Sequence, residues 1–215
     1  MDFLPRDISA YVEAHTTEPS GLLSTIDHET HEQVLMPRML SGHLQGRLLS
    51  MISKIQQPKS ILEIGTYTGY STICLAEGLS KEGNITTLDI NEELESRVKQ
   101  YFEESGFNEQ INFAIGNALE LIPKLNANWD LVFIDADKVN YGNYYDLVID
   151  RLNPGGVIIA DNVLWSGKVI EERRKKLDKD TKALIDFNKK VHEDNRVENV
   201  LLPIRDGLMM LRKNN

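Results

Sequence analysis

The 215-residue sequence has one cysteine, no long apolar run and no excess of basic side chains. Cys74 cannot form a disulfide within the chain, and its apolar neighbours favour a buried, unreactive thiol. No segment approaches the roughly 20 apolar residues that a membrane helix needs. The N-terminal residues lack the basic and apolar segments of a signal peptide. These absences predict a cytoplasmic protein without a membrane partner.

The balance of 24 basic and 33 acidic residues gives a net charge of −9. Proteins that bind a phosphate backbone usually carry positive charge on the binding face, so the negative net charge argues against nucleic acid as a partner. Three short patterns are also missing: the H-E-x-x-H zinc motif, the G-x-S-x-G nucleophile turn and the G-x-x-x-x-G-K-[ST] phosphate loop. The sequence therefore does not predict a zinc protease, a hydrolase with a serine elbow or a P-loop enzyme.

The first 57 residues contain no convincing strand, and their apolar spacing predicts a helix over residues 35–52. We predict an N-terminal helical extension over residues 1–57 and one structural unit over residues 58–215. In the second part, strands and helices alternate. The predicted strands cover residues 61–64, 84–89, 111–115, 129–134, 157–160, 197–202 and 207–212. The predicted helices cover residues 70–79, a segment from 91, 118–125, 141–152 and 178–193.

Five apolar strands separated by helices predict a parallel sheet covered on both faces, with the last two strands paired as a hairpin. Ligands of such sheets bind at the carboxyl ends of the strands. Polar side chains with a binding role should therefore be strand-terminal. Glu63, Asp89, Asp135 and Asp161 each lie at or near the end of a predicted strand.

The first strand leads through a turn containing Gly65 and Gly69 into a helix, which suits a nucleoside ligand. The dinucleotide fingerprint G-x-G-x-x-G is absent because residue 67 is tyrosine. Asp89 can accept hydrogen bonds from both hydroxyls of a ribose. Glu63 would repel a pyrophosphate but suits a sulfonium or amino group. The alternative is a glycine turn with an acid that only caps it.

Asp135 and Asp161-Asn162 follow two apolar strands that should be neighbours, so their side chains should converge. Carboxylate and amide oxygens, without cysteine or histidine, favour a hard divalent cation: magnesium first, with calcium or manganese as alternatives. The competing interpretation is that these residues cap turns. Two neighbouring carboxylates would then repel each other without a compensating cation.

Three segments resemble one family. They are E-I-G-T-Y-T-G-Y-S at 63–71, F-I-D-A-D-K at 133–138 followed by Asn140, Tyr141 and Tyr144, and D-N-V-L-W-S-G at 161–167 after a Gly-Gly pair. In this order and spacing they resemble the cation-dependent O-methyltransferases, which include the catechol and caffeoyl-CoA O-methyltransferases. The similarity runs from about Met36 to the C-terminus and is greatest to small bacterial members.

The resemblance implies a Rossmann-like class I methyltransferase fold with a seven-stranded, mostly parallel sheet, a C-terminal antiparallel hairpin, helices on both faces and an N-terminal helical extension. It also implies S-adenosylmethionine as cofactor, a phenolic small molecule as substrate and a homodimer. Asp135, Asp161 and Asn162 match the metal ligands, and Lys138 matches the catalytic lysine, acting with Asp135. Cofactor contacts are implied for Met39, Ser41, Glu63, Gly65, Thr66, Ser71, Asp89, Ala118, Asp135 and Asp137.

The expected reaction is methylation of one hydroxyl of a catechol-like phenol, with Lys138 taking the phenol proton. Ser166 stands where the plant caffeoyl-CoA enzymes have an asparagine, so caffeoyl-CoA itself does not follow from the resemblance. Lys138 could instead be a surface lysine paired with Asp135 or Asp137. Two other functions stay open: a metal-independent methyltransferase of small molecules, and a non-catalytic nucleoside-binding domain of the same fold.

Overall fold

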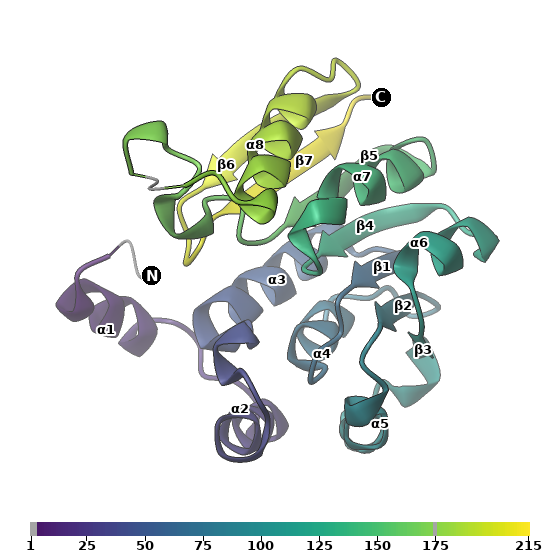
Figure 1. The fold of residues 1–215 in the computed structure, drawn as a ribbon. Helices are drawn as coiled ribbons and strands as arrows, with labels where there is room; N and C mark the ends of the chain where they lie inside the picture. The colour runs from purple at the N-terminus through teal and green to yellow at the C-terminus, as the bar shows by residue number, and fades with distance from the viewer. Residues whose placement is uncertain (1–3, 174–175) are drawn as a thin grey trace. The chain divides into compact units, whose positions relative to one another are not determined.

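The computed structural model describes residues 4–173 and 176–215, whose ribbon is drawn in Figure 1. Chain contacts group these residues into an N-terminal unit, Leu4–Asn117, and a C-terminal unit that begins at Ala118. Each unit is described by itself. The division of the chain at residue 57, between a helical extension and the remainder, stays a prediction.

The N-terminal unit begins with helices and continues with three strands, whose order is β3-β2-β1 and whose pairing is parallel. Its α-helices are α1 (Arg6–Ala14), α2 (Gly21–Gln33), α3 (Gly42–Gln56), α4 (Tyr70–Ala76) and α5 (Glu95–Glu104). Its strands are β1 (Ser60–Ile64), β2 (Asn84–Asp89) and β3 (Ile111–Ile115). The predicted strands at 61–64, 84–89 and 111–115 are thereby confirmed.

The predicted helix over residues 35–52 is wrong at its start. The helix α3 begins only at Gly42, and a short 3-10 turn, Pro37–Met39, precedes it. Proline disfavours helical geometry in the residue before it, and Met36 takes a left-handed φ of 63°. Within α3, a Cβ on Gly46 would lie 2.5 Å from the Tyr70 ring, so glycine lets this helix pack closely on α4.

The C-terminal unit contains four strands in the order β4-β5-β7-β6. The β4–β5 pair is parallel, and the β5–β7 and β6–β7 pairs are antiparallel. Its strands are β4 (Trp129–Ile134), β5 (Leu152–Ala160), β6 (Val197–Leu202) and β7 (Leu208–Lys213). Its α-helices are α6 (Ala118–Leu121), α7 (Tyr141–Ile149) and α8 (Lys179–His192). The predicted C-terminal hairpin is confirmed.

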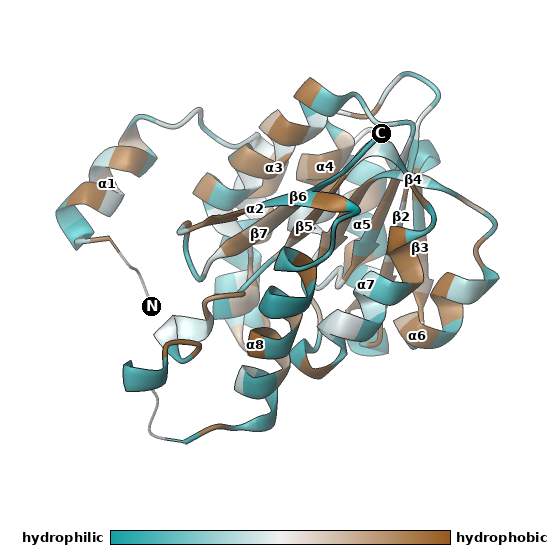
Figure 2. Ribbon diagram, turned by 90° about the horizontal axis from the view of Figure 1, so that it is seen from above, coloured by the Kyte–Doolittle hydropathy of each residue, from teal (hydrophilic) through white to brown (hydrophobic). Residues whose placement is uncertain are grey.

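The hydropathy of the strands and of α8 agrees with their burial. Figure 2 shows brown, apolar segments along the strands, whereas α8 alternates between teal and brown. The buried residues of α8 include Leu184, Phe187 and Val191, which recur at helical spacing. Asp178 caps this helix by accepting a 2.8 Å hydrogen bond from the Thr181 backbone N–H. A half-buried, amphipathic helix is the expected cover for an apolar sheet.

The predicted fold class is confirmed: the described residues contain seven strands, with parallel pairs in both units and an antiparallel hairpin at the C-terminus. Several limits differ from the expectation. The helices predicted over 70–79 and 141–152 end at Ala76 and Ile149, and the α-helix expected from residue 91 begins at Glu95 after a 3-10 turn. The strand predicted over 157–160 begins at Leu152 and includes the Pro-Gly-Gly segment. The helix predicted over 118–125 ends at Leu121 and continues as a 3-10 turn. No helix among the described residues is both long and apolar enough to cross a membrane.

Candidate active site

In the N-terminal unit, the loop between β1 and α4 is shaped by left-handed backbone. Gly65 has a φ of 103° and Gly69 a φ of 81°, which glycine adopts without steric cost. A Cβ on Gly69 would also lie 2.7 Å from the Phe102 ring. The Gly69 N–H closes the turn on the Thr66 carbonyl at 2.8 Å. The loop is therefore tight, and position 69 accommodates only glycine.

Glu63 is a fully buried carboxylate near the end of β1. Its Oε2 accepts hydrogen bonds from the hydroxyls of Thr72 and Thr87, the second at 2.6 Å. The Thr87 hydroxyl also lies 2.6 Å from that of Thr66, which belongs to the glycine loop. Burial of a carboxylate is costly unless hydrogen bonds compensate it. The two threonines fix the position of the carboxylate.

Asp89 connects the end of β2 with the glycine loop. Its Oδ2 accepts a 2.6 Å hydrogen bond from the Tyr67 N–H, and its Oδ1 accepts a 2.8 Å bond from the Asn91 N–H. A carboxylate has about four acceptor positions, so these two bonds are compatible with two further donors such as ribose hydroxyls. Asp89 thus does cap the turn, as the simpler interpretation held, and keeps the capacity to bind a ligand.

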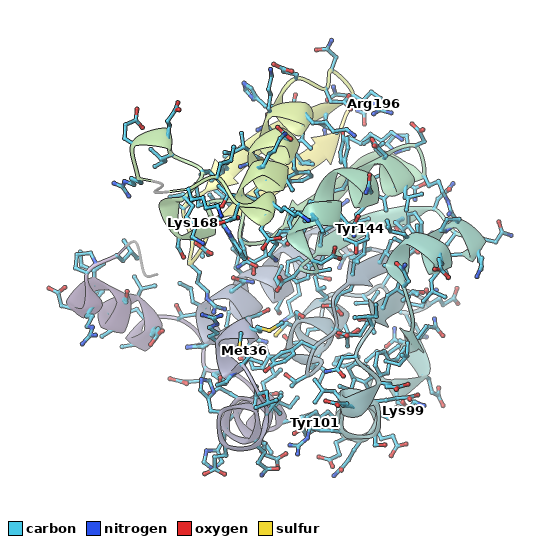
Figure 3. The ribbon with its side chains drawn as sticks, in the orientation of Figure 1. Met36, Lys99, Tyr101, Tyr144, Lys168 and Arg196 are labelled. Carbon is cyan, nitrogen blue, oxygen red and sulfur yellow. The ribbon has the colours of Figure 1, made fainter. Side chains whose placement is uncertain are left out.

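Tyr67 connects the glycine loop to the segment before α3, which contains the predicted cofactor contacts Met39 and Ser41. The sequence did not predict this connection. Its hydroxyl lies 3.1 Å from the Leu35 carbonyl and 3.3 Å from the Met36 carbonyl. Figure 3 labels Met36 in the stretch between α2 and α3. That stretch includes Met39, which is 54% exposed, and ends at the buried Ser41. The predicted contacts near residues 39–41 are therefore tethered to the glycine loop. Ser71, also predicted, is buried in the first turn of α4.

In the C-terminal unit, Asp135 and Asp161 come directly after paired strand residues. Ile134 of β4 is in register with Ala160 of β5, and the Asp161 N–H donates to the Ile134 carbonyl at 2.9 Å. Asp161 is only 3% exposed. Asn162 follows with a left-handed φ of 62°, and its N–H donates to Asp161 Oδ1 at 2.6 Å. The neighbouring strands expected from the sequence are present, and they bring these residues to one edge of the sheet.

Lys138 is buried rather than on the surface, with 8% of its area exposed. Its Nζ lies 3.0 Å from Asp135 Oδ1 and donates to the Tyr141 hydroxyl at 2.7 Å. The Tyr141 hydroxyl in turn donates to the Asp161 carbonyl at 2.9 Å. Burial, followed by the charges of Asp135 and Asp161, raises the pKa of Tyr141 well above its usual range. Tyr141 therefore stays a neutral phenol that links Lys138 to both strand ends.

Asp137 has different partners from Asp135. It accepts hydrogen bonds from the Tyr144 hydroxyl and from Asn140 Nδ2, and Figure 3 labels Tyr144 on α7. Ala118, the other cofactor contact predicted in this unit, is the buried first residue of α6. Of the two pairings considered for Lys138, the structure contains the one with Asp135.

The donor set at the ends of β4 and β5 fits a hard cation. Two carboxylates and an amide offer oxygen atoms only, which suits magnesium, calcium or manganese better than zinc. Asp135 and Asp161 together carry two negative charges, against the single positive charge of Lys138 at 3.0 Å from Asp135. Among the described residues, no group of three or more histidine, cysteine, aspartate or glutamate side chains forms a further candidate metal site.

Comparison with known proteins agrees with this geometry. Residues 13–214 match the model of a protein family described as O-methyltransferase. The chain belongs to this family. Caffeoyl-CoA O-methyltransferases from Medicago sativa and Eucalyptus globulus are 35% and 37% identical over 179 residues, which cover 79% of this chain and 72% of each relative.

Solved structures extend the likeness to nearly the full chain. An O-methyltransferase from Bacillus cereus in complex with SAH has a TM-score of 0.88 at 29% identity, covering 97% of both chains. An SAH-bound methyltransferase from Podospora anserina has a TM-score of 0.90 at 27% identity, covering 99% of both chains. The predicted class of enzyme, an S-adenosylmethionine-dependent O-methyltransferase, is confirmed.

Proposed function

We propose that this O-methyltransferase requires a divalent cation and methylates one hydroxyl of a catechol-like phenol. The observation that carries the proposal is the cluster of Asp135, Lys138, Tyr141 and Asp161 at the paired ends of β4 and β5. Asp135 Oδ1 lies 3.0 Å from Lys138 Nζ, and Tyr141 joins that nitrogen to the backbone carbonyl of Asp161 at the neighbouring strand end. The relatives named caffeoyl-CoA O-methyltransferases support a phenolic acceptor.

The N-terminal unit would hold the methyl donor, S-adenosylmethionine, which supplies an electrophilic methyl group when bound. Asp89 would accept hydrogen bonds from the ribose hydroxyls, with its other acceptor positions used by the loop. The fixed charge of Glu63 would favour the positively charged amino acid portion of the donor. The further cofactor contacts predicted from the sequence stay predictions: Met39, Ser41, Gly65, Thr66, Ser71, Ala118, Asp135 and Asp137.

Asp135, Asp161 and Asn162 would hold the cation, and magnesium suits their oxygen atoms best. When bound, it would favour ionisation of a phenol, whose ordinary pKa near 10 leaves little nucleophile at neutral pH. Lys138 Nζ is the proposed proton acceptor, and it would act in its neutral amine form. Tyr141 is unsuited to that role because its phenol is already protonated and its pKa is raised. Its bonds instead fix the position of the lysine amine.

A panel of acceptors tests the proposal. Catechol, caffeate, caffeoyl-CoA and a flavonoid with vicinal hydroxyls would be compared with matched monophenols, each with and without Mg²⁺. The proposal predicts cation-dependent methylation of the vicinal diols and little turnover of the monophenols. Equal rates on monophenols would contradict the catechol-like acceptor, and equal rates without the cation would favour a metal-independent enzyme. A homodimer and a cytoplasmic location stay predictions.

A further inference from the structure

The loop after β5 has an unusual backbone. Asn162, Trp165 and Ser166 have positive φ angles of 62°, 48° and 54°, and Gly167 follows with 79°. Left-handed geometry strains a non-glycine residue, because its Cβ comes too close to the following carbonyl oxygen. Such a loop persists only where neighbouring groups hold it in place. Because the loop begins at a proposed cation ligand, the groups that hold it bear on the acceptor side of the reaction.

The turn between β6 and β7 supplies those groups. Asp206 Oδ1 accepts a 2.5 Å hydrogen bond from the Ser166 N–H, and the Asp206 carbonyl accepts one from the Leu164 N–H at 2.9 Å. The Gly207 carbonyl accepts a further bond from the Val163 N–H at 3.1 Å. A Cβ on Gly207 would lie 2.5 Å from Leu164 Cγ, so the two segments are in close contact. The Asp206 carboxylate therefore bonds the backbone at Ser166, the second of two successive left-handed residues, Trp165 and Ser166.

Trp165 lies in the turn that Asp206 supports, and its side chain is near Lys138. Its ring centroid lies 6.0 Å from Lys138 Nζ and 5.6 Å from the Nζ of Lys168, which Figure 3 labels. Among the described residues, its buried indole Nε1 has no hydrogen-bond acceptor. The ring is therefore not oriented by a hydrogen bond of its own. Its place beside Lys138 depends on the backbone of the Trp165-Ser166 turn.

We propose that Asp206 is a positioning residue for the acceptor: its carboxylate holds the Trp165-Ser166 turn, so that Trp165 forms an aromatic wall beside Lys138. The acceptor assignment rests on the proposed function. A planar phenol gains affinity by packing against a fixed aromatic face. Loss of the carboxylate would free the turn and weaken acceptor binding, while the methyl donor and the proton acceptor keep their own contacts.

Fluorine NMR makes the turn observable without an activity assay. The chain has only two tryptophans, Trp129 and Trp165, so protein labelled with 5-fluorotryptophan should give two fluorine resonances, of which that of Trp165 reports the turn. A Trp165→Phe variant assigns them. Asp206→Ala removes the acceptor of the Ser166 N–H, whereas Asp206→Asn keeps an oxygen that can accept it. Asp194→Ala is the matched control, because it removes a carboxylate that bonds a backbone N–H in the same unit, that of Arg196.

For Asp206→Ala we expect a shifted or broadened Trp165 resonance and a KM for catechol raised about tenfold, the effect of one lost hydrogen bond. The kcat should stay within about threefold and the KM for S-adenosylmethionine should not change. Asp206→Asn should restore most of the acceptor affinity. Asp194→Ala should lower the Tm without moving the Trp165 resonance or the KM values.

An unchanged Trp165 resonance in Asp206→Ala, or Asp206→Asn behaving like Asp206→Ala, would overturn the proposal. So would a rise in the KM for catechol that Asp194→Ala reproduces, because general destabilisation would then explain it. Failure of the proposed function looks different. In that case the wild-type protein would neither methylate catechol nor shift the Trp165 resonance on titration with it, and the acceptor role of Asp206 would fall too.

Discussion

The two units place acidic residues at strand ends in different surroundings. In the N-terminal unit, Glu63 and Asp89 accept hydrogen bonds from threonine hydroxyls and backbone N–H groups. In the C-terminal unit, Asp135 faces the ammonium group of Lys138, and Tyr141 joins that lysine to the backbone of Asp161. Neutral donors orient a carboxylate for a ligand. The C-terminal cluster differs because it places a lysine nitrogen and a tyrosine hydroxyl beside a carboxylate.

From this difference we expect the N-terminal unit to bind the methyl donor and the C-terminal cluster to carry out the reaction. Changes to the acids of the N-terminal unit should alter affinity for the methyl donor and leave turnover nearly intact. Changes to Lys138, Tyr141 or Asp161 in the C-terminal unit should alter turnover and leave donor affinity nearly intact.

The largest effect is expected for Asp161→Ala. Loss of a proposed cation ligand should lower kcat more than about 100-fold, while the Kd for S-adenosylmethionine stays within a few-fold. Initial rates and calorimetric titration measure the two quantities. Asp161→Asn serves as a second variant, because its oxygen can still accept the bond from the Asn162 N–H. Retained turnover in a folded variant would contradict the ligand assignment.

Lys138→Met should rank next. It keeps the length and burial of the side chain but removes the amine that contacts Asp135 and Tyr141. A positioned acid or base contributes roughly 10²–10⁴-fold to a rate, so kcat should fall by at least 100-fold. Donor affinity should not change. If kcat at neutral pH matched that of the wild type, Lys138 would have no part in the proton transfer.

Asp89→Asn should give a smaller effect of the opposite kind. The amide nitrogen cannot accept a hydrogen bond, so either a loop bond or a ribose bond is lost. A hydrogen bond to a charged group contributes roughly 1.5–3 kcal/mol, which corresponds to a 10- to 150-fold loss of donor affinity. The kcat at saturating donor should remain within about threefold. A large fall in kcat with unchanged donor affinity would remove the distinction between the units.

Glu77 of the N-terminal unit sharpens the comparison, because it is a charged group with a role in stability alone. Burial by itself would raise the pKa of Glu77, but hydrogen bonds from Arg47, Lys54 and Ser50 outweigh it and lower the pKa to about 2. A lowered pKa stabilises the folded state above the unfolded value near 4.5, and this contribution is lost as the pH falls toward 2.

Glu77→Gln should therefore destabilise the protein at pH 7 by roughly 3 kcal/mol and leave kcat and KM unchanged. Urea unfolding at pH 7, 5, 4 and 3 measures the difference in unfolding free energy from the wild type. It should be constant from pH 7 to 5 and shrink below about 4.5. The exposed Glu82→Gln is the control, with no change expected. A difference that does not depend on pH would contradict the ionised role of Glu77.

The strand ends were predictable because apolar runs mark the strands and the alternation of strands with helices predicts which of them are parallel. The strands at 111–115 and 129–134 have the predicted limits, and the parallel order placed Asp135 next to Asp161. The start of β5 was not predictable in the same way. Pro154 and the two glycines after it are typical of a turn, but the chain already runs along β4 from Leu152, with an irregular register near Trp129.

The contacts that complete the site depend on tertiary structure and left little trace in the sequence. Tyr67 reaches the carbonyls of residues 35–36, more than thirty positions away. Tyr141 links Lys138 to Asp161 across 20 positions. Asp206 supports a turn 40 positions earlier. A tyrosine hydroxyl or a loop aspartate has no spacing rule that identifies a distant backbone partner, so only the folded chain reveals these roles.

The central claim is that the C-terminal cluster supports methyl transfer through a cation. The most direct test is the initial rate of methyl transfer to catechol by chelator-treated protein, measured while Mg²⁺ is added back. We predict a rate near background after chelation and a saturable recovery with Mg²⁺, which Asp135→Ala and Asp161→Ala both lose. A full rate in the chelated protein, unchanged by added Mg²⁺, would contradict the account.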